Sequence, residues 1–453
     1  MLTTRRRAAR SDAVPTVSPA GTLATAPAVA LGTALAVTLG TALAALTTLA
    51  APPAAGAGPE PVRFSTFNAS LNRSAEGALV ADLSTTTNVQ AANVAETIQR
   101  VRPDVLLVNE FDYDAAGTAL RLFQDNYLSV PHHGSVPISY PYRYSAPSNT
   151  GISSGFDLNN NGVTDTTPGD NAYGDDSFGF GVYPGQYGMA VYSRYPIRTE
   201  AVRTFQTFLW KDMPGAMLPD DPATAAPADW YSPAELDVFR LSSKSHWDVP
   251  LDVAGRTVHF LVSHPTPPVF DGPEDRNGTR NHDEIRFWAD YVRPSHSGYI
   301  YDDEGERGGL TPGASFVIAG DLNSDPLDGD SVPGSTQQLL DDPRVNANQA
   351  PTSDGGPWAA ETQDALNLTH RSDPAQDTAD FCDTAVAPPC SGPGNLRADY
   401  VLPSKNLRIV GGGIFWPTDE QPYFYLTGPG FPVPTSDHRE VWVDVRVPGA
   451  VAR

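Results

Sequence analysis

Two side chains that can act on a phosphate follow one short apolar run. The run occupies residues 316–319, and after a glycine the chain places a carboxylate at Asp321 and a carboxamide at Asn323. Residues i and i+2 of an extended segment point the same way, so both can reach one small ligand at the end of a buried strand. That geometry suits a metal-bound phosphate. The alternative is a turn in which both side chains hydrogen-bond their own backbone.

Further apolar runs along the chain end in, or begin at, polar groups of the same kind. In chain order these groups are Asn68, Glu110, His264, Asp399 and the pair Asp437-His438. Each run is short and rich in Val, Leu, Ile or Phe, which predicts buried strands. Random polar residues would seldom give Asn, Glu, His, Asp/Asn, Asp and Asp-His in this order, and the order therefore indicates one shared site.

In these residues the chain resembles the endonuclease/exonuclease/phosphatase superfamily, which includes pancreatic deoxyribonuclease, abasic-site endonucleases, sphingomyelinases and inositol polyphosphate phosphatases. The resemblance runs from about residue 62 to about residue 447. Its most specific pieces are Gly-Asp-Leu-Asn at 320–323, Asp399-Tyr400 and Ser-Asp-His at 436–438. It implies an α/β (α+β) fold of the deoxyribonuclease-I type, a four-layered sandwich of two facing mixed β-sheets flanked by helices.

Two positions depart from common patterns of that superfamily. Asn109 precedes the Glu where many relatives have Gln, and Ser70 stands where some nucleases keep a further acidic residue. The departures leave the core chemistry intact but weaken any inference to a particular substrate.

The resemblance implies a role for each metal-binding and water-activating group. Glu110 resembles the principal ligand of a divalent cation, with Asn68 beside it and Asp437 as a second ligand. Asp321 resembles the residue that orients or deprotonates the attacking water, and Asn323 resembles a donor to a phosphoryl oxygen.

The resemblance also implies roles for two histidines. His438 resembles the group that contacts the scissile phosphate and assists proton transfer, with Asp399 holding its tautomer. His264 matches the second histidine of the deoxyribonuclease-like branch, a general acid for the leaving oxygen. Each assignment has a simpler alternative, such as a strand-end cap for Asn68, an extended loop residue for His264 or a turn cap for Asp437.

The chemistry itself points to a hard cation. Phosphoester hydrolysis needs charge neutralised on the phosphoryl oxygens, and hard cations take oxygen ligands such as carboxylates. Mg²⁺ binds through one or two carboxylates and keeps several waters, so this sparse ligand set fits Mg²⁺, or Mn²⁺, better than zinc, which would need Cys and His clusters. A histidine poised near neutral pH can then donate or accept the proton, contributing typically about 10²–10⁴-fold.

The predicted catalytic groups span residues 68 to 438, so one domain must bring both ends of the chain together. The 453 residues, 40% of them hydrophobic, suffice for one large or two ordinary domains, and we expect a single domain over residues 59–450. Helices are expected at 89–101, before Pro103, and at 281–292, where Asn281 and Glu284 have the spacing of a capping box.

Residues 1–58 have the plan of an export signal. Four arginines within the first ten residues precede a long uncharged tract, most apolar over 29–51, and small residues follow at 53–58. We expect secretion with cleavage within residues 51–58. The alternative is an uncleaved membrane anchor, but the tract is rich in Ala, Gly and Thr, which makes a poor permanent span, so we expect no stable span in the mature protein.

The charge bears on the binding partners, and the cysteine content agrees with export. The whole chain has a formal net charge of −23, and without residues 1–57, which carry four Arg and one Asp, the remainder has −26. A strongly acidic body repels polyanions, which argues against a general nucleic-acid-coating protein. Cys382 and Cys390 are the only cysteines, and we expect a disulfide between them, with two free thiols as the alternative.

A second motif predicts calcium binding. Residues 157–165 match the first nine positions of an EF-hand-type loop, with ligands from Asp157, Asn159, Asn161, the carbonyl of Val163, and Asp165. Pro168 occupies the position of the usual bidentate Glu, so Asp170 or the pair Asp175-Asp176 would have to substitute. An Asn/Gly-rich turn is the alternative. We interpret residues 143–186, which contain the motif, as a long insertion in the core fold.

These observations predict a secreted, divalent-metal-dependent phosphoesterase, a monomer, that attacks a phosphodiester or phosphomonoester with an in-line water. Nucleic acid is one candidate substrate. The alternatives are a phosphatase or phospholipid phosphodiesterase of the same fold, and a non-catalytic extracellular calcium-binding protein that kept the fold.

Overall fold

The computed structural model describes residues 60–363, 365–382, 390, 392–428 and 433–450. The predicted export segment and its cleavage region lie outside these residues. The strands are β1 (Val62–Leu71), β2 (Val105–Phe111), β3 (Tyr142–Tyr144), β4 (Met189–Ser193), β5 (Arg203–Thr204), β6 (His246–Val253), β7 (Arg256–Ser263), β8 (Ser315–Asp321), β9 (Ala379–Phe381), β10 (Gly394–Leu396), β11 (Asp399–Pro403), β12 (Arg408–Ile414) and β13 (Val441–Arg446).

Short helices connect the strands. The α-helices are α1 (Ala78–Leu83), α2 (Val89–Val101), α3 (Thr118–Phe123), α4 (Asn171–Asp175), α5 (Pro233–Leu236), α6 (Arg276–Tyr291), α7 (Gln337–Leu340) and α8 (Gly355–Gln363). A π-turn at Gln124–Leu128 extends α3, and single 3₁₀ turns lie at Thr199–Ala201, Trp210–Asp212, Ser297–Tyr299, Ala365–Thr369, Pro374–Gln376 and Phe424–Leu426.

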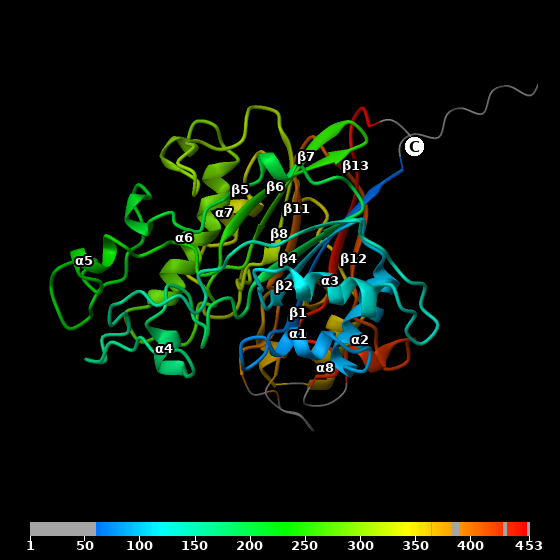
Figure 1. Ribbon diagram of the computed structural model, residues 1–453, viewed down its shortest axis with the longest axis horizontal. Helices are drawn as coiled ribbons and strands as arrows, with labels where there is room; N and C mark the ends of the chain where they lie inside the picture. Colours follow the sequence, from blue (N-terminus) through cyan, green and yellow to red (C-terminus); the bar gives the residue numbers. More distant parts are fainter. Residues whose placement is uncertain (1–59, 364, 383–389, 391, 429–432, 451–453) are drawn as a thin grey trace, which may run out of the picture. The chain divides into compact units, whose positions relative to one another are not determined.

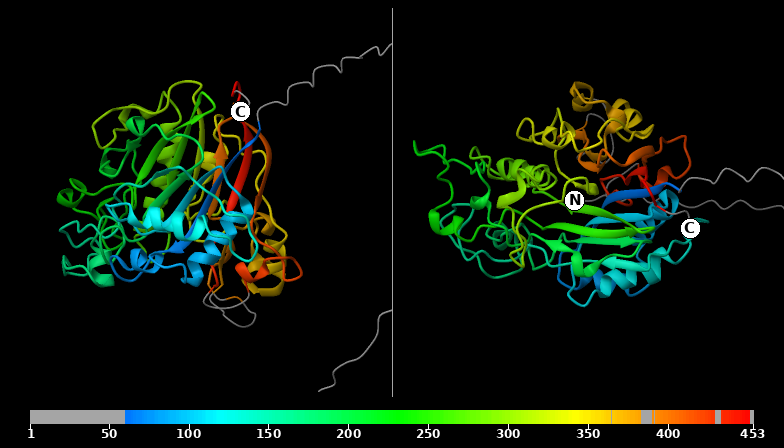
Figure 2. Two further views of the ribbon diagram at one scale, coloured as in Figure 1. Left: turned by 45° about the vertical axis from the view of Figure 1, so that its right-hand side comes forward. Right: turned by 90° about the horizontal axis from the view of Figure 1, so that it is seen from above.

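The strands form two large mixed sheets that face each other (Figures 1 and 2). One sheet has the order β12-β13-β1-β2-β4-β3, and the other has the order β11-β8-β7-β6-β5. β1 and β2 are parallel, as are β7 and β8, whereas the remaining pairs in both sheets are antiparallel. A small ladder of β9 and β10 lies apart from both.

Three hydrophobic clusters separate four layers. Phe64, Leu107 and Phe260, from both sheets, belong to the cluster between the sheets. A second cluster joins outward-facing residues of β1, β2 and β4 to α1, α2 and α3, and a third joins β7, β8 and β11 to α6. The predicted α/β fold of two mixed sheets flanked by helices is therefore confirmed.

The first predicted helix is confirmed, and the start of the second is wrong. α2 spans the expected residues, and the Asn88 side chain caps it by accepting a hydrogen bond from the Ala91 amide at 2.9 Å. α6 begins five residues earlier than predicted, at Arg276. Asn281 is therefore inside the helix and does not cap it, because its side chain finds partners on neighbouring loops.

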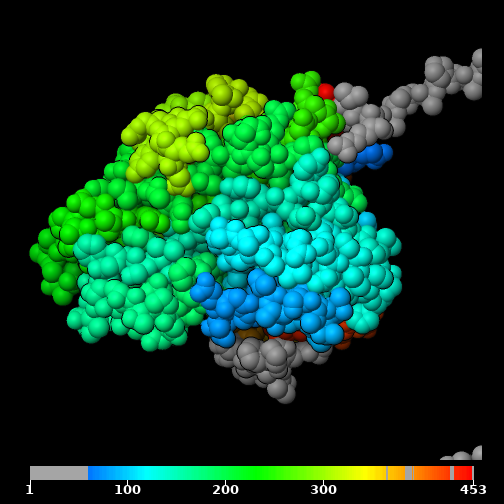
Figure 3. Space-filling view, viewed as in Figure 1, coloured from blue at the N-terminus to red at the C-terminus, as the bar shows by residue number. Residues whose placement is uncertain are grey.

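The interpretation of residues 143–186 as an insertion needs one correction at its start. β3 pairs with β4 as the edge strand of the six-stranded sheet, so the sheet continues through Tyr144. From there to β4 the chain is irregular apart from α4, and with the segment around α5 it forms a lobe beside the N-terminal helices (Figures 1 and 3).

No helix in the described part of the chain has both the length and the apolar character needed to cross a membrane. The described residues belong to one compact unit.

Candidate active site

Strand alternation aims the predicted polar groups at the space between the sheets. In β1 the even-numbered Val62 and Phe64 belong to the central cluster, whereas Phe67 and Ala69 contact the helix layer. Asn68 continues the even-numbered set and therefore faces inward. The same counting places three further residues on the inner face of their strands, namely Asn109 after Leu107, Asp321 after Ala319 and Asp399 before Val401. His264 directly follows the end of β7, two residues after the inward-facing Val262.

Strand register then brings these inward groups to one edge. Asp399 of β11 pairs directly with Asp321 of β8, and Asn68 of β1 pairs with Asn109 of β2. The Asn109 side chain links the sheets, because its Oδ1 accepts from Thr66 Oγ1 at 3.2 Å and from the Asp321 amide at 3.4 Å. Asn109 thus connects the part of the site on β1 and β2 with the part on β8.

The backbone turns sharply where the strands reach this edge. Ser70, Glu110 and Asn323 all have left-handed φ values, of 48°, 56° and 51°. Such values are uncommon outside glycine, and among these residue types only Asn adopts them readily. The turns redirect side chains at the strand ends, and at Glu110 the strain accompanies a carboxylate that points into the site.

A hydrogen-bond network joins the two central carboxylates. The Asn68 Nδ2 donates to Glu110 Oε1 at 3.1 Å and to Asp321 Oδ2 at 3.0 Å. Asn72 Nδ2 donates to Glu110 Oε2 at 2.7 Å. Glu110, predicted as a metal ligand, and Asp321, predicted as the water-activating group, therefore lie on either side of a single carboxamide.

Both predicted histidines lie next to Asp321. The distance from Asp321 Oδ2 is 3.3 Å to His264 Nε2 and 3.6 Å to His438 Nε2. His438 Nδ1 lies 2.8 Å from Asp399 Oδ2, which also accepts a hydrogen bond from Thr378 Oγ1 at 2.8 Å. The geometry expected for a carboxylate that orients a histidine is present.

The two histidines differ in charge. Burial alone would lower the pKa of His438, but the carboxylates of Asp399 and Asp321 outweigh it and hold that pKa well above its ordinary value. Burial and the Lys244 ammonium lower the pKa of His264 to about 4. At neutral pH His438 is therefore charged and His264 neutral, which favours His438 over His264 as the proton donor.

The donor set fits a hard cation. Burial raises the pKa of Glu110 to about 7, and repulsion by Asp437 and Asp321 acts in the same direction, so the site gathers more negative charge than its surroundings neutralise. Asp321, Asp399 and His438 also place ligand atoms within 4.8 Å of one another. Because His438 and Asp399 are already hydrogen-bonded to each other, Glu110 and Asp437, whose carboxylates are close enough to repel each other, are the better candidates to hold the ion.

Two predicted site residues, Asn323 and Asp437, have hydrogen-bond partners within the protein. Asn323 Nδ2 donates to the Pro265 carbonyl at 3.2 Å, so that amide holds the loop after His264 in this structure. Asp437 Oδ1 lies within 3.3 Å of Ser70 Oγ and 3.4 Å of Ser436 Oγ. Ser70, at the position where some relatives are acidic, supports the carboxylate of Asp437.

Four residues of the site were not predicted from the sequence as part of it: Asn72, Asn109, Lys244 and Thr378. Asn109 adjoins Glu110 in the sequence, and that proximity could have indicated it. Asn72 lies just beyond a β-bulge between Asn68 and Leu71, and bulges are not visible in residue patterns. Lys244 and Thr378 lie in segments with no sequence motif that would indicate a functional site.

The site opens into a cavity of about 1330 Å³. One wall comes from the lobe around α4 and includes Asp175 and Phe180. Another comes from the loops after β8 and includes Asp325 and Asp328, while Pro268 and Phe270 follow His264. Phe270 is 86% exposed at the rim.

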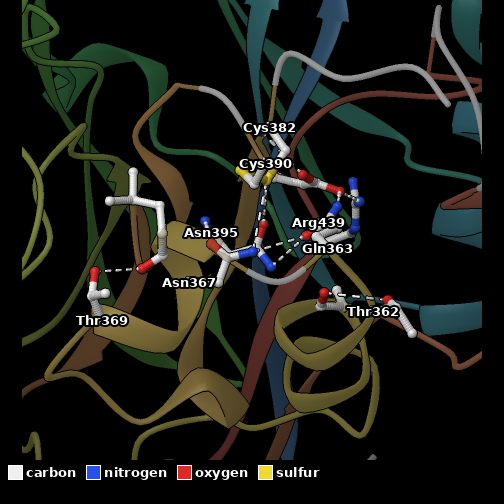
Figure 4. Close-up of a disulfide and its surroundings, with 11 residues drawn as sticks. Thr362, Gln363, Asn367, Thr369, Cys382, Cys390, Asn395 and Arg439 are labelled. Atoms are coloured by element: carbon white, nitrogen blue, oxygen red, sulfur yellow. Dashed lines mark hydrogen bonds and ion pairs between the residues drawn. A yellow bond between two sulfur atoms is a disulfide. The ribbon is translucent and has the colours of Figure 1, made fainter. Parts of the chain in front are cut away.

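The predicted disulfide is confirmed and lies at this cavity. Cys382, which lines it, is bonded to Cys390 (Figure 4). Asn395 and Asn367 surround the sulfur atoms and are joined to Gln363 of α8 by hydrogen bonds of 2.9 and 3.1 Å. The neighbouring Phe381 packs edge-on against His438, with ring centroids 5.3 Å apart. The disulfide thus fixes a segment whose Phe381 side chain packs against His438.

The calcium-type loop has a compact conformation that involves Asp176. Asp157 accepts hydrogen bonds from the amides of Asn161 and Gly162 at 3.1 and 2.7 Å. Asp176 accepts from the amides of Leu158 and Asp165 at 2.9 and 2.7 Å. Of the two sequence candidates for the missing acidic ligand, Asp176 therefore lies against the loop, whereas Asp170 caps α4.

Comparisons with known proteins assign the chain to a family. A model of the Endonuclease/Exonuclease/phosphatase family matches residues 66–438. No curated protein matches the sequence closely enough to count as a relative. An endonuclease/exonuclease/phosphatase structure from Beutenbergia cavernae is 17% identical, with 86% of this chain and 72% of that chain covered and a TM-score of 0.44.

Two further solved structures are similar at comparable levels. The human Nocturnin catalytic domain is 13% identical, covering 85% of this chain and 93% of its own, with a TM-score of 0.42. Sphingomyelinase C from Streptomyces griseocarneus is 15% identical, covering 85% and 99%, with a TM-score of 0.40. At such values these structures carry no information on substrate, and the family assignment rests on the match over residues 66–438.

Proposed function

Because the chain belongs to the endonuclease/exonuclease/phosphatase family and is thus a metal-dependent phosphoric ester hydrolase, we propose that it is a secreted enzyme that uses Mg²⁺ or Mn²⁺ to hydrolyse a phosphodiester or phosphomonoester with an in-line water. The observation that carries the proposal is the position of Asp321. Its carboxylate lies within 3.6 Å of Asn68 and of both histidines, and Asp321 lines the cavity.

Each residue has a task that its surroundings support. Glu110 and Asp437 would hold the cation, which supplies charge neutralisation at the phosphoryl oxygens. The Asp321 carboxylate stays ionised, because His438 and His264 outweigh the cost of its burial and lower its pKa, and it can orient and deprotonate water. His438, charged through Asp399, can donate a proton to the leaving oxygen.

Two other functions differ in what the chain must contain. A phosphatase or phospholipid phosphodiesterase would use the same groups, and the acidic body favours such substrates over nucleic acid. A non-catalytic calcium-binding protein would not need the full set of site residues. Because Glu110, His264, Asp321, Asp399 and His438 all converge, a catalytic role is the better supported.

Export is supported by features on both sides of residue 58. The N-terminal segment has a basic region, an apolar tract and small residues, and the only two cysteines are paired. N-terminal sequencing of protein recovered from the culture medium tests export, and a start within residues 52–59 is the expected result.

Activity is tested with Asp321→Asn and a panel of phosphoesters. The panel contains plasmid DNA, a phosphomonoester and sphingomyelin, each with and without Mg²⁺. We expect metal-dependent hydrolysis of at least one, and a loss on the order of 10³-fold or more in Asp321→Asn with unchanged thermal unfolding. Asp125→Asn, which alters an exposed ion pair with Arg121, is the matched control. Near wild-type activity in Asp321→Asn would refute the assigned role.

A further inference from the structure

Lys244 is a buried cation in the wall of the cavity. It lies in the segment just before β6, and only 7% of its surface is exposed. It lines the cavity together with His264, Asp321 and Glu110. Among the described residues, its ammonium has no hydrogen bond and no ion pair, although it is close enough to His264 to influence its pKa.

The other cations that line the cavity already have partners. Arg276 forms an ion pair with Glu274, and Arg280 donates hydrogen bonds to the carbonyl oxygens of Leu241, Phe178 and Arg240. Lys244 therefore differs from Arg276 and Arg280 in having an ammonium available to a ligand.

The position of Lys244 is fixed by its backbone rather than by its side chain. Its carbonyl accepts a hydrogen bond from the Asn149 amide at 2.8 Å, and the preceding Ser243 amide donates to Glu284 Oε1 at 2.7 Å. Glu284 belongs to α6 and is itself buried. The fold thus holds this lysine in the wall through groups that need no lysine side chain.

An ammonium at the end of a buried side chain, with no hydrogen-bonding partner among the described residues, is costly to keep charged. Burial lowers the pKa of Lys244, and only longer-range attraction by Glu284, Asp321 and Glu110 opposes that effect. A methionine, unbranched and of similar length, would fit such a site at lower cost in folding free energy. The presence of a charge here indicates a function in binding rather than in folding.

We propose that Lys244 forms an anion-binding site in the cavity wall, where its ammonium binds a phosphoryl oxygen of the substrate. The inference rests on the proposed function for the identity of the anion. A cation beside three carboxylates is suited to a ligand that carries its own negative charge, and lysine acts as a compact point charge toward phosphate.

Binding of inorganic phosphate tests the site without turnover. Calorimetric titration of the full chain in Mg²⁺ is compared for wild type, Lys244→Met and Lys211→Met, the last removing an exposed lysine paired with Asp237. We expect Lys244→Met to bind phosphate on the order of 10- to 100-fold more weakly, as for loss of a charge-assisted hydrogen bond, and Lys211→Met to match wild type.

Thermal unfolding separates a binding role from a structural one. Because Lys244→Met removes an unpaired charge from a largely buried side chain, its unfolding temperature should equal or exceed that of wild type although binding is lost. Lys244→Arg, which keeps the charge, should recover part of the phosphate affinity. Lys244→Gln, which keeps hydrogen-bond donors without charge, should not.

Two results would overturn the proposal: phosphate affinity in Lys244→Met equal to that of wild type, or equal affinities in the Gln and Arg variants. In either case hydrolysis by the wild type, measured on the phosphoester panel, would leave the proposed function standing. Conversely, Lys244-dependent phosphate binding in a chain that hydrolyses no phosphoester would refute the proposed function and leave the anion site intact.

Discussion

His264 and His438 lie beside the same carboxylate, that of Asp321, but differ in the charged groups next to them. His438 has a second carboxylate behind it, Asp399, whereas His264 has the Lys244 ammonium nearby. In a buried site, neighbouring charges decide which protonation state survives. At neutral pH the site therefore holds one charged imidazole, His438, and one neutral imidazole, His264. A charged imidazole can donate a proton and a neutral imidazole can accept one.

Asn72 is predicted to tune metal binding through Glu110. Its Nδ2 donates to Glu110 Oε2 at 2.7 Å, and a partner of a metal ligand typically changes metal affinity about 10- to 100-fold when removed. In Asn72→Ala we expect the Mg²⁺ concentration for half-maximal activity to rise by at least about 10-fold, with a smaller change in rate at saturating Mg²⁺. A metal titration of activity measures both. An unchanged Mg²⁺ requirement would contradict Glu110 as the ligand.

Glu440 makes stability depend on pH without taking part in the site. It is fully buried, Ser65 donates to its Oε1 at 2.8 Å, and burial raises its pKa to about 8. The folded state therefore keeps a proton that the unfolded state releases near its ordinary pKa of 4.5. The resulting stabilisation is complete below pH 4.5 and is lost as pH rises through about 8.

Glu440→Gln should remove this pH dependence. Relative to wild type, its free energy of unfolding should increase between pH 5 and pH 9 by on the order of a few kcal/mol. Denaturant titrations at several pH values give the difference. Asp444→Asn, which lies four residues further along in β13 and is paired with Arg63, serves as the comparison. A constant difference across this range would show that Glu440 is ionised in the folded protein.

At the scale of elements, strand ends and loops position the side chains of the site, and α6 supports two of these loops. Asn281 donates to the carbonyl oxygens of Thr266 and Leu322, each at 2.8 Å. Thr266 lies two residues after His264, and Leu322 directly follows Asp321. One helical side chain therefore connects the two loops that leave the site.

Asn281→Ala should leave both carbonyls unpaired. We expect the free energy of unfolding to fall by about 1–3 kcal/mol and the catalytic rate to fall because the two loops lose their common support. Thr279→Ala on the same helix is the control, since its hydroxyl contacts only carbonyls at the start of α6. Chemical denaturation and steady-state kinetics report the two effects. Equal behaviour of both variants would argue against the bracing role.

Calcium binding at residues 157–165 remains a prediction. The conformation of the loop indicates Asp157 and Asp176 as the ligands to test. If Asp157 and Asp176 contribute ligands, millimolar Ca²⁺ should stabilise the protein by roughly 1–3 kcal/mol, as for an extracellular site of low affinity. Asp157→Asn and Asp176→Asn should lose this effect, and Asp170→Asn should keep it. Thermal unfolding with Ca²⁺, with Mg²⁺ and with chelator measures it. Equal stabilisation of wild type and Asp157→Asn would show that no calcium binds at this loop.

At the scale of the whole molecule, charge limits which substrates approach. The net charge of −23 creates a repulsive field toward polyanions, and salt screens that field over about 10 Å at 0.1 M. We therefore expect any hydrolysis of plasmid DNA to accelerate as salt rises from about 20 to 200 mM, opposite to the behaviour of basic DNA-binding proteins. A small phosphodiester such as bis-p-nitrophenyl phosphate should change little. A DNA rate that falls with salt would indicate a local basic path to the site.

Most of the site could be predicted from the sequence because its residues sit at strand ends. A buried strand is recognisable in the sequence as an apolar run. The polar residue that follows the run is adjacent to it in the sequence, as at Glu110, His264 and Asp321. The helix at 89–101 was predictable for a similar reason, since Val94, Ile98 and Val101 recur on one face before Pro103. Local patterns and the resemblance they carry were sufficient there.

Tertiary structure alone decided what those residues contact. The start of α6 was mispredicted because Asn281 finds its partners on loops distant in the sequence, and no local pattern records them. Asn72 reaches Glu110 only through a bulge, and Lys244 faces the cavity only because strands and α6 surround it. The sequence by itself determined the chemical groups and the strands that carry them, since those depend on near neighbours. The charge of each histidine, the partners of each amide and the unpaired lysine depend on residues far away in the chain, so only packing in three dimensions could decide them.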